Sequence, residues 1–224
     1  MIIAIDAMGG DQAPEINVAG ALEAVQAWHD IEIILVGDES KIRACMPQDT
    51  DRISIHHTEE VILPDDEPVR AVRRKKNASM VVAGRLVKEK KANAMISAGN
   101  TGALMTTGLL VIGRLKGVER PGLAPILPTV NQAGVLAIDL GANMDADPEH
   151  LVQYARMGSI YRNRVDGLEN PRVGLLNVGT EEMKGNELTK AVYPMLEQAP
   201  IHFVGNVESR DILDGACDVL VCDG

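Results

Sequence analysis

Short apolar runs alternate with amphipathic segments along the whole chain, and most runs end at glycine, aspartate or asparagine. Short apolar runs bounded by turn residues are typical of strands buried in a parallel sheet. The pattern predicts strands over residues 2–5, 31–36, 53–55, 94–96, 134–140, 172–178, 201–204 and 218–222.

Between these runs, apolar residues recur at helical spacing, as Val18, Leu22 and Val25 do after Pro14. We expect helices after Pro14, over residues 69 to about 91 with a break near Asn77, over 100–116, over 148–165 and over 187–196. Residues 123–130 are proline-rich and are expected to be extended. Strands alternating with helices predict an α/β fold with a doubly wound, mostly parallel sheet, formed by residues 1–224 as a single domain.

Ligands of such sheets bind outside the carboxyl ends of the strands, where this chain carries its glycine-rich loops. We expect these loops to line one crevice. They contain Asp6, Gly9, Gly10 and Asp11; Gly99, Asn100, Thr101 and Gly102; Asp139 and Asn143; Gly179, Thr180, Lys184 and Asn186; and Gly205 and Asn206.

The central loop is Ser97–Leu104, which joins a strand to a helix. The first amides of a helix lack intrahelical partners and attract anions, and Gly99 and Gly102 allow close approach of a ligand. Asn100 and Thr101 add side-chain donors suited to a phosphate or a carbonyl oxygen. The alternative is an ordinary strand-to-helix turn in which Asn or Thr is the N-cap.

Composition and charge exclude several classes of function. The chain is 46% hydrophobic and 24% charged, with a net charge of −10, one Trp, one Phe and three Tyr. This acidic, aromatic-poor composition argues against nucleic-acid binding. The three cysteines lack metal-ligand spacing and indicate reduced thiols in the cytoplasm. Neither a signal peptide nor a membrane-spanning run is evident, so any membrane contact is expected to be peripheral.

Residues 69–76 form the strongly basic patch of this acidic chain, with Arg70, Arg73, Arg74, Lys75 and Lys76. Such a run is often a solvated helix face. Because its sign opposes the net charge, the competing interpretation is a docking site for an acidic partner or an anionic substrate.

The usual catalytic motifs are missing. No defensible Ser-His-Asp order, nucleotide motif or cysteine with an adjacent base is present. Asp6, Asp11 and Asp139 could meet, but no spacing compels a metal site. The remaining chemistry is positioning of phosphate against a thioester carbonyl, with Lys184 stabilising charge. Lys184 could equally be a solvated lysine paired with Glu181 or Glu187.

Motifs in register give a family resemblance. They are residues 6–14 (DAMGGDQAP), 67–70 (EPVR), 97–103 (SAGNTGA), 139–143 (DLGAN) and 173–181 (VGLLNVGTE). Over essentially the whole chain the sequence resembles the bacterial acyl carrier protein:phosphate acyltransferases. The resemblance implies a fold like that of isocitrate and isopropylmalate dehydrogenases and phosphotransacetylase. It also implies conversion of acyl-[acyl carrier protein] and orthophosphate into acyl phosphate without a cofactor or metal.

The resemblance further implies a homodimer that contacts the membrane surface and supplies glycerol-3-phosphate acyltransferase in phospholipid synthesis. It implies that the family chain continues beyond Gly224, with a further asparagine and an apolar membrane-contact region; the chain's end directly after a strand likewise indicates a truncated C-terminal part. Acyl carrier proteins are acidic, so the five basic residues at 70–76 become docking residues. Loops and resemblance together give Lys184 and Asn100 as catalytic, and as substrate-binding Asp6, Gly9, Gly10, Gly99, Thr101, Gly102, Asn143, Thr180 and Asn206.

Three other functions are compatible with the residues. The first is a phosphotransacetylase acting on acetyl-coenzyme A, which performs the same chemistry on another carrier. The second is a metal- and nicotinamide-dependent decarboxylating dehydrogenase. The third is a non-catalytic scaffold at the membrane surface.

Overall fold

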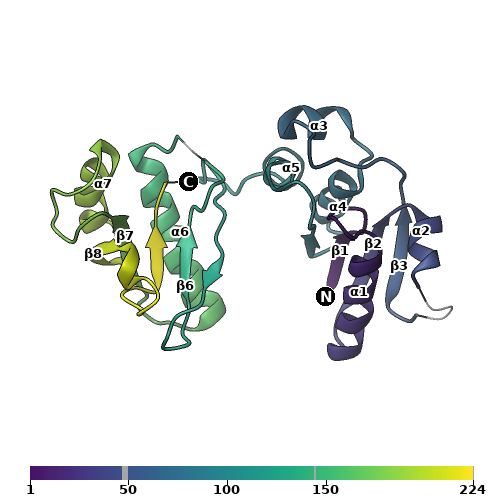
Figure 1. Ribbon diagram of the computed structural model, residues 1–224, viewed down its shortest axis with the longest axis horizontal. Coiled ribbons are helices and arrows are strands. Elements are labelled where there is room, and N and C mark those ends of the chain that lie inside the picture. The colour runs from purple at the N-terminus through teal and green to yellow at the C-terminus, as the bar shows by residue number, and fades with distance from the viewer. Residues whose placement is uncertain (47–49, 144, 224) are drawn as a thin grey trace. The chain divides into compact units, whose positions relative to one another are not determined.

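The computed structural model describes residues 1–46, 50–143 and 145–223. Their contacts form two compact units, Met1–Lys116 and Gly117–Gly224, each with its own sheet (Figure 1). The sequence analysis expected one domain built on one sheet. Periodicity identifies strands but not the sheet to which each belongs, and the glycine- and proline-rich stretch after Ile112 separates the two sets.

The N-terminal unit contains a four-stranded parallel sheet in the order β3-β2-β1-β4. Its strands are β1 (Ile2–Asp6), β2 (Glu32–Gly37), β3 (Ile53–His57) and β4 (Ala94–Ile96). Its helices are α1 (Glu15–Ala27), α2 (Glu39–Ala44), α3 (Pro68–Arg74), α4 (Ser79–Lys88) and α5 (Thr101–Thr107), followed by the π-helix η1 (Gly108–Ile112).

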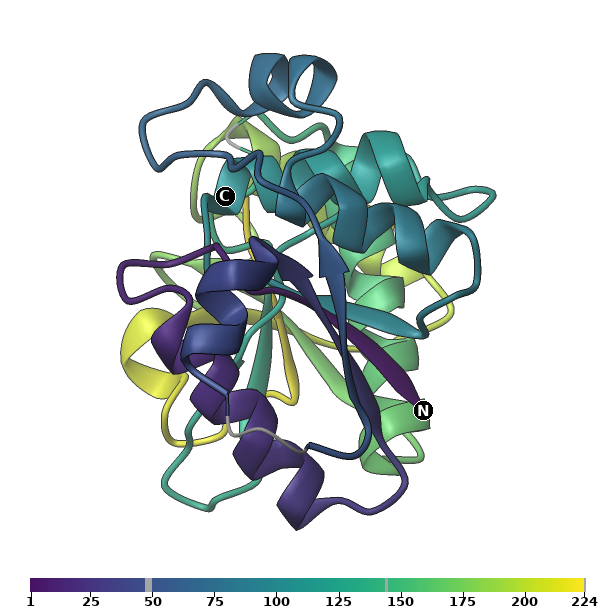
Figure 2. The same ribbon diagram turned by 90° about the vertical axis from the view of Figure 1, so that its right-hand side faces the viewer.

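Helices pack against both faces of this sheet. On one face, α1 buries Val18 and Val25 against Ile33 of β2, and the purple helix runs beside the strands in Figure 1 and Figure 2. On the other face, α4 buries Leu86 against Ala4 of β1. Because successive side chains of a strand point to opposite faces, both layers hold the strands while the loops at their carboxyl ends stay accessible.

The basic segment forms two helices, with the break where it was expected. α3 ends at Arg74 and α4 begins at Ser79, so Asn77 lies between them. The helix expected over residues 100–116 is shorter: α5 passes into η1, which ends at Ile112 and is followed by Gly113 with φ of 99°. Glycine adopts this left-handed conformation without a steric penalty, so the helix stops there.

The C-terminal unit contains a five-stranded sheet in the order β5-β6-β9-β7-β8, in which β5 is antiparallel to β6. Its strands are β5 (Ile126–Leu127), β6 (Val135–Ile138), β7 (Arg172–Asn177), β8 (His202–Glu208) and β9 (Val219–Val221). Its helices are α6 (Pro148–Asp166), α7 (Glu187–Gln198) and the short 3-10 turn η2 (Ser209–Asp211).

The faces of this second sheet are covered differently. α6 and α7 pack on one face, where Leu151 and Leu196 meet Val173 and Val219. The opposite face carries Val135, Ala137 and Leu220 and is packed by Leu127 and by loop residues Ile212 and Ala216. Among the described residues of this unit, helices cover one face only, so the expectation of helices on both faces is met in the N-terminal unit alone.

Strand β8 extends beyond its predicted end. Gly205 and Asn206 were expected in a loop after the strand, but both pair with β7 inside β8. The register shifts beside Val173, and Gly205 takes a φ of 92°. A glycine within a strand often marks such a bulge, so the strand continues through the residue that had been taken as its end.

Among the residues described, no helix is long and apolar enough to cross a membrane.

Candidate active site

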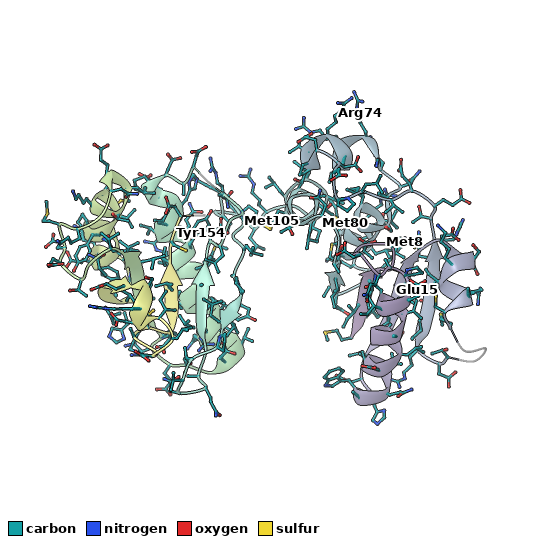
Figure 3. The ribbon with its side chains drawn as sticks, in the orientation of Figure 1. Met8, Glu15, Arg74, Met80, Met105 and Tyr154 are labelled. Atoms are coloured by element: carbon teal, nitrogen blue, oxygen red, sulfur yellow. The ribbon has the colours of Figure 1, made fainter. Side chains whose placement is uncertain are left out.

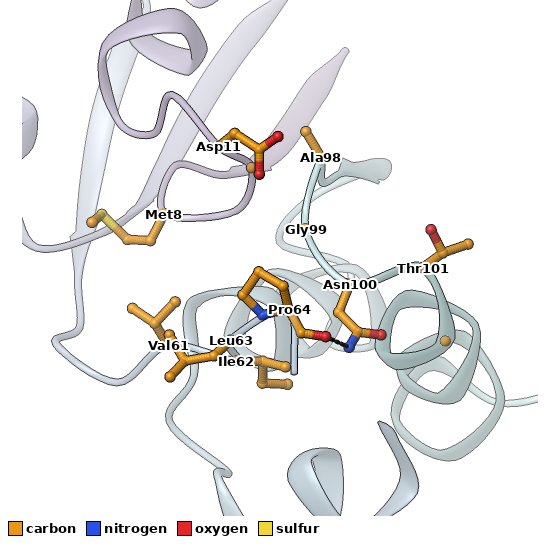
Figure 4. Close-up of a pocket in the computed structure, with 12 residues that line it drawn as sticks. Met8, Asp11, Val61, Ile62, Leu63, Pro64, Ala98, Gly99, Asn100 and Thr101 are labelled. Atoms are coloured by element: carbon orange, nitrogen blue, oxygen red, sulfur yellow. Dashed lines mark hydrogen bonds between the residues drawn. The ribbon is translucent and has the colours of Figure 1, made fainter. Parts of the chain in front are cut away.

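A cavity of about 490 Å³ lies in the N-terminal unit beside the carboxyl ends of β1 and β4 (Figure 4). Three segments line it: the loop after β1, the apolar segment 61–64 and the turn 98–102. The loops after β1 and β4, both predicted as ligand-binding loops, are thus brought together. Parallel pairing of β1 with β4 explains this, because the two strands end side by side.

The Asp6 side chain is buried beside this site and accepts hydrogen bonds from the protein. Its side chain is 2% exposed, and its carboxylate accepts hydrogen bonds from Ser79 Oγ at 2.5 Å and Ser97 Oγ at 2.7 Å. Ser97 Oγ in turn accepts a hydrogen bond from the Gly99 amide at 3.1 Å. Asp6 is therefore part of a network that fixes the turn after β4.

Gly9 is needed because the two loops approach closely. A Cβ at Gly9 would lie 2.5 Å from Asp6 Oδ2 and 2.9 Å from the Gly99 nitrogen. Gly10 is exposed, lines the cavity and has a φ of 107°. Asn17, which the sequence analysis missed, donates through Nδ2 to the Gly9 carbonyl at 2.9 Å. An asparagine within a helix gives no sequence signal for this role.

Asn100 is also used internally. Its Oδ1 caps α5 by accepting from the Ala103 amide at 2.9 Å. Its Nδ2 donates to the Pro64 carbonyl at 2.9 Å, the dashed line in Figure 4, and to the Asp66 carbonyl at 3.2 Å. An amide group has two N–H donors, and both are taken. The N-cap alternative therefore describes the side chain, which shapes the cavity instead of offering donors to it.

The donors left at this turn belong mostly to the backbone. In the described part of the chain, the amides of Thr101 and Gly102 at the start of α5 have no protein partner, as is usual for the first turn of a helix. Thr101 is exposed on the cavity rim. A Cβ at Gly102 would lie 2.7 Å from Pro68 Cγ, so glycine also allows α3 to pack here. The geometry suits an anion or a carbonyl oxygen.

The opposite wall of the cavity is apolar, which the sequence analysis missed. The sequence analysis assigned no ligand-binding role to residues 61–64. The run Val61-Ile62-Leu63-Pro64 lines the cavity, with Ile62 buried and Leu63 exposed. The signal was this apolar run, which begins four residues after the end of β3 at His57. A cavity with polar amides on one side and aliphatic groups on the other suits an acyl group.

In the C-terminal unit, the loop between β7 and α7 carries Lys184. Two asparagines hold this loop: Asn177 Nδ2 donates to the Lys184 carbonyl at 3.0 Å, and Asn206 Nδ2 donates to the Glu181 carbonyl at 2.9 Å. Gly185, with φ of 93°, has no room for a Cβ, which would lie 2.2 Å from Thr189 Oγ1. The backbone of Lys184 is therefore closely fixed.

The Lys184 side chain, by contrast, is 53% exposed, and its Nζ lies 4.0 Å from Glu181 Oε1. An exposed pair at this distance contributes little, so the ammonium group stays available to an anion. Thr180 beside it is exposed as well. Asn206 is different: it is 7% exposed, its Nδ2 holds the loop, and its buried Oδ1 has no hydrogen-bond partner among the described residues.

Asn143 likewise has a structural environment. Its Nδ2 donates to Asp139 Oδ2 and to the Tyr154 hydroxyl, both at 2.9 Å. Burial raises the pKa of Tyr154 to about 12, and the nearby Asp139 carboxylate makes a smaller contribution in the same direction. Tyr154 lies inside the unit in Figure 3. Asn143, expected to bind substrate, is thus part of a cluster that fixes the loop after β6.

The five residues of the basic patch differ in their contacts. Lys75 points inward: its Nζ lies 2.5 Å from Asp66 Oδ2 and 3.0 Å from the Val61 carbonyl, and this contact lowers the pKa of Asp66. Arg70, Arg73, Arg74 and Lys76 are exposed, and Arg74 extends outward from α3 in Figure 3. The expected docking set therefore reduces to these four residues.

Covalent thiol chemistry gains no support. Burial raises the pKa of Cys217 to about 11 and that of Cys222 to about 12. Both thiols are protonated at neutral pH and are poor nucleophiles. Within the described ranges, no group of three potential metal-ligating side chains occurs.

Comparison with known proteins identifies the family. Residues 1–224 match the family model described as "Fatty acid synthesis protein". The chain is 59% identical over 224 residues to the phosphate acyltransferase of Halalkalibacterium halodurans and 61% identical to that of Bacillus cereus. The chain belongs to the phosphate acyltransferase family. All of this chain is covered in both comparisons, against 66% and 68% of the two relatives, so it spans about two thirds of their length.

Solved structures support the fold of this family member. EutD phosphotransacetylase from Staphylococcus aureus matches with a TM-score of 0.66 at 19% identity, covering 99% of this chain and 77% of that one. A branched-chain phosphotransacylase from Enterococcus faecalis matches with a TM-score of 0.61 at 17% identity, covering 97% and 78%. The predicted α/β, phosphotransacetylase-like fold is confirmed, as is the predicted family, an acyltransferase family of fatty acid and phospholipid synthesis.

Proposed function

We propose that the complete protein transfers a long-chain acyl group from acyl carrier protein to orthophosphate. The observation that carries this proposal is the 59–61% identity to phosphate acyltransferases over every residue of this chain. The cavity at the turn after β4 supports it, because backbone donors and an aliphatic wall suit the carbonyl and the chain of an acyl group.

The reaction needs no activated side chain. A phosphate oxygen attacks the thioester carbonyl carbon, the C–O bond forms, and a tetrahedral oxyanion develops. The C–S bond then breaks, acyl phosphate leaves, and the carrier thiolate takes up a proton. Because phosphate is already a nucleophile at neutral pH, catalysis consists of alignment and stabilisation of the oxyanion.

We assign the residues as follows. The free amides of Thr101 and Gly102 hold an anionic oxygen, as helix N-termini do. Lys184 stabilises negative charge, supported by its exposed ammonium on a closely fixed backbone. Asn100 and Asp6 position the turn rather than touch the substrate, in keeping with their internal hydrogen bonds.

The carrier docks on Arg70, Arg73, Arg74 and Lys76 in this proposal. Acyl carrier proteins are acidic, and these exposed cations stand out in a chain with a net charge of −10. The proposal includes a cytoplasmic homodimer at the membrane surface, whose acyl phosphate product is used by a glycerol-3-phosphate acyltransferase.

The test is release of free carrier thiol from long-chain acyl carrier protein, with and without phosphate. It is run on this chain and on the chain extended to the length of its relatives. We expect the extended chain to release thiol only when phosphate is present. Release without phosphate, or none at all, contradicts the proposal, and faster turnover of acetyl-coenzyme A than of acyl carrier protein would favour a phosphotransacetylase instead.

A further inference from the structure

A second concave site lies in the N-terminal unit, on the surface formed by α3, α4 and η1. It has a volume of about 470 Å³ and an apolar floor. Val72 of α3 and Val81 of α4 are buried at the base of this groove, and η1 adds Leu110 and Val111. Leu110 is 44% exposed. An exposed leucine beside buried valines leaves aliphatic surface that a ligand could cover.

Four cations surround this floor: Arg73 of α3, Lys76 in the turn after α3, and Arg85 and Lys88 of α4. Among the described residues, no carboxylate oxygen lies within 4.0 Å of a side-chain nitrogen of these four residues, so none of them forms an ion pair. The Arg85 guanidinium donates to the Lys76 carbonyl, which fixes it at the gap between the two helices. In a chain with a net charge of −10, this is a concentrated positive site.

We propose that this groove binds a single-chain anionic amphiphile, a molecule with a carboxylate or phosphate head on an alkyl or acyl chain. The rim cations provide the head with charge-assisted hydrogen bonds, and the valines and leucine take part of the chain out of water. A bare phosphate would leave the apolar floor uncovered, whereas an uncharged chain would leave the cations unused. Only a ligand with both parts matches both features.

This groove is distinct from the cavity at the turn after β4, because the two share no lining residue. The inference does not depend on the proposed activity. If that activity holds, its long-chain acyl phosphate product belongs to the same ligand class, so the groove would be a place for product to bind away from the reacting atoms.

The first experiment measures binding to the full chain by calorimetry. The probe is dodecyl phosphate below its critical micelle concentration, compared with butyl phosphate and with the neutral dodecyl maltoside. We expect dodecyl phosphate to bind at least about tenfold more tightly than either, because burial of methylenes and charge pairing both contribute. Equal binding of butyl phosphate, or of the maltoside, would overturn the proposal.

Variants then locate the site. Arg73→Glu with Lys88→Glu reverses two rim charges on different helices. Arg43→Glu with Lys91→Glu makes the same change in net charge at exposed positions outside the groove. We expect the first pair to weaken dodecyl phosphate binding about tenfold or more and the control pair to change it less than about twofold. Circular dichroism and thermal melts establish that both variants fold.

Three outcomes count against the groove. Unchanged affinity in both double variants would place the ligand elsewhere. An equal loss in both would show a general charge effect. Binding to vesicles of anionic lipid without binding of monomeric dodecyl phosphate would show surface adsorption in place of a single-chain site.

Loss of chain-length dependence in Leu110→Ser, with butyl phosphate binding unchanged, would support the apolar floor directly.

Discussion

The buried carboxylate of Asp6 and the hydroxyl of Ser97 are joined by a 2.7 Å hydrogen bond between the ends of β1 and β4. Ser97 also accepts from the Gly99 amide, so one side chain links a buried charge to the turn that opens the cavity. The motif residue at position 6 thus acts on the site through position 97.

Ser97→Ala should therefore destabilise the protein and lower its activity. It leaves one Asp6 oxygen and the Gly99 amide without their partner, and an unsatisfied buried polar group costs about 1–3 kcal/mol. The free energy of unfolding from urea denaturation measures the first effect, and phosphate-dependent thiol release by the complete enzyme measures the second. Ser54→Ala is the control, because Ser54 Oγ reaches the Ile33 carbonyl only at 3.5 Å. Equal effects of the two substitutions would show that the Asp6 network does not fix the turn.

Gly185→Ala tests the backbone beside Lys184. Gly185 and Gly167 of the C-terminal unit both have positive φ, 93° and 72°. A Cβ at Gly167 meets nothing within 4 Å, whereas one at Gly185 lies 2.2 Å from Thr189 Oγ1. Gly167→Ala should lower the free energy of unfolding only by the steric penalty of a left-handed alanine, about 1–2 kcal/mol. Gly185→Ala should cost clearly more, because the first turn of α7 must move. Equal losses in thermal stability would contradict the crowding seen here.

Lys184→Ala tests charge stabilisation. Removing one oxyanion-stabilising donor costs on the order of 10²–10³ in rate, and we expect a loss of that size in the kcat of the complete enzyme. Lys190→Ala on α7 is the control, since Lys190 is exposed on the following helix. A decrease below about threefold would leave Lys184 as the solvated lysine that its contact with Glu181 allows.

The order of strands and helices could be predicted from the sequence. The hydrogen-bonding role of each polar side chain could not. Apolar runs predicted most strands within a few residues, because burial imposes the pattern directly. Asn100, Asn143 and Asn206 were all expected to face a substrate, yet the Nδ2 of each donates to a group of the protein. An asparagine that caps a helix or holds a loop has the same sequence signature as one that binds a ligand. Only the positions of its neighbours distinguish the two.

The division into two sheets was missed for a related reason. β4 and β6 both show short apolar runs, but β4 pairs with β1 and β6 with β9. Strand pairing depends on contacts distant in sequence, which periodicity does not contain. The family resemblance, in contrast, rested on motifs matched along the whole chain and was confirmed.

Carrier docking predicts a salt-dependent effect. Arg70→Glu with Arg74→Glu should raise the KM for acyl carrier protein and flatten its dependence on ionic strength, because attraction between opposite charges is what salt screens. Lys41→Glu with Arg43→Glu on α2 makes the same change in net charge outside the basic patch. If both pairs raise KM equally, the carrier responds to overall charge and not to this patch.

The pair Arg172–Asp218 gives a pH prediction for the C-terminal unit. Asp218 Oδ1 lies 2.9 Å from Arg172 Nη2, and Oδ2 accepts from Arg172 Nε at 3.1 Å. Burial alone would raise the pKa of Asp218, but the hydrogen bonds from Arg172 outweigh it and hold the pKa below the usual 3.8. A lowered folded pKa means that the carboxylate contributes stability above the unfolded pKa and loses it as the pH falls toward the folded value. The difference in unfolding free energy between wild type and Asp218→Asn should therefore stay constant above about pH 5 and shrink below about pH 4. A difference that stays constant throughout acid titration would mean that the ionised carboxylate is not what stabilises this pair.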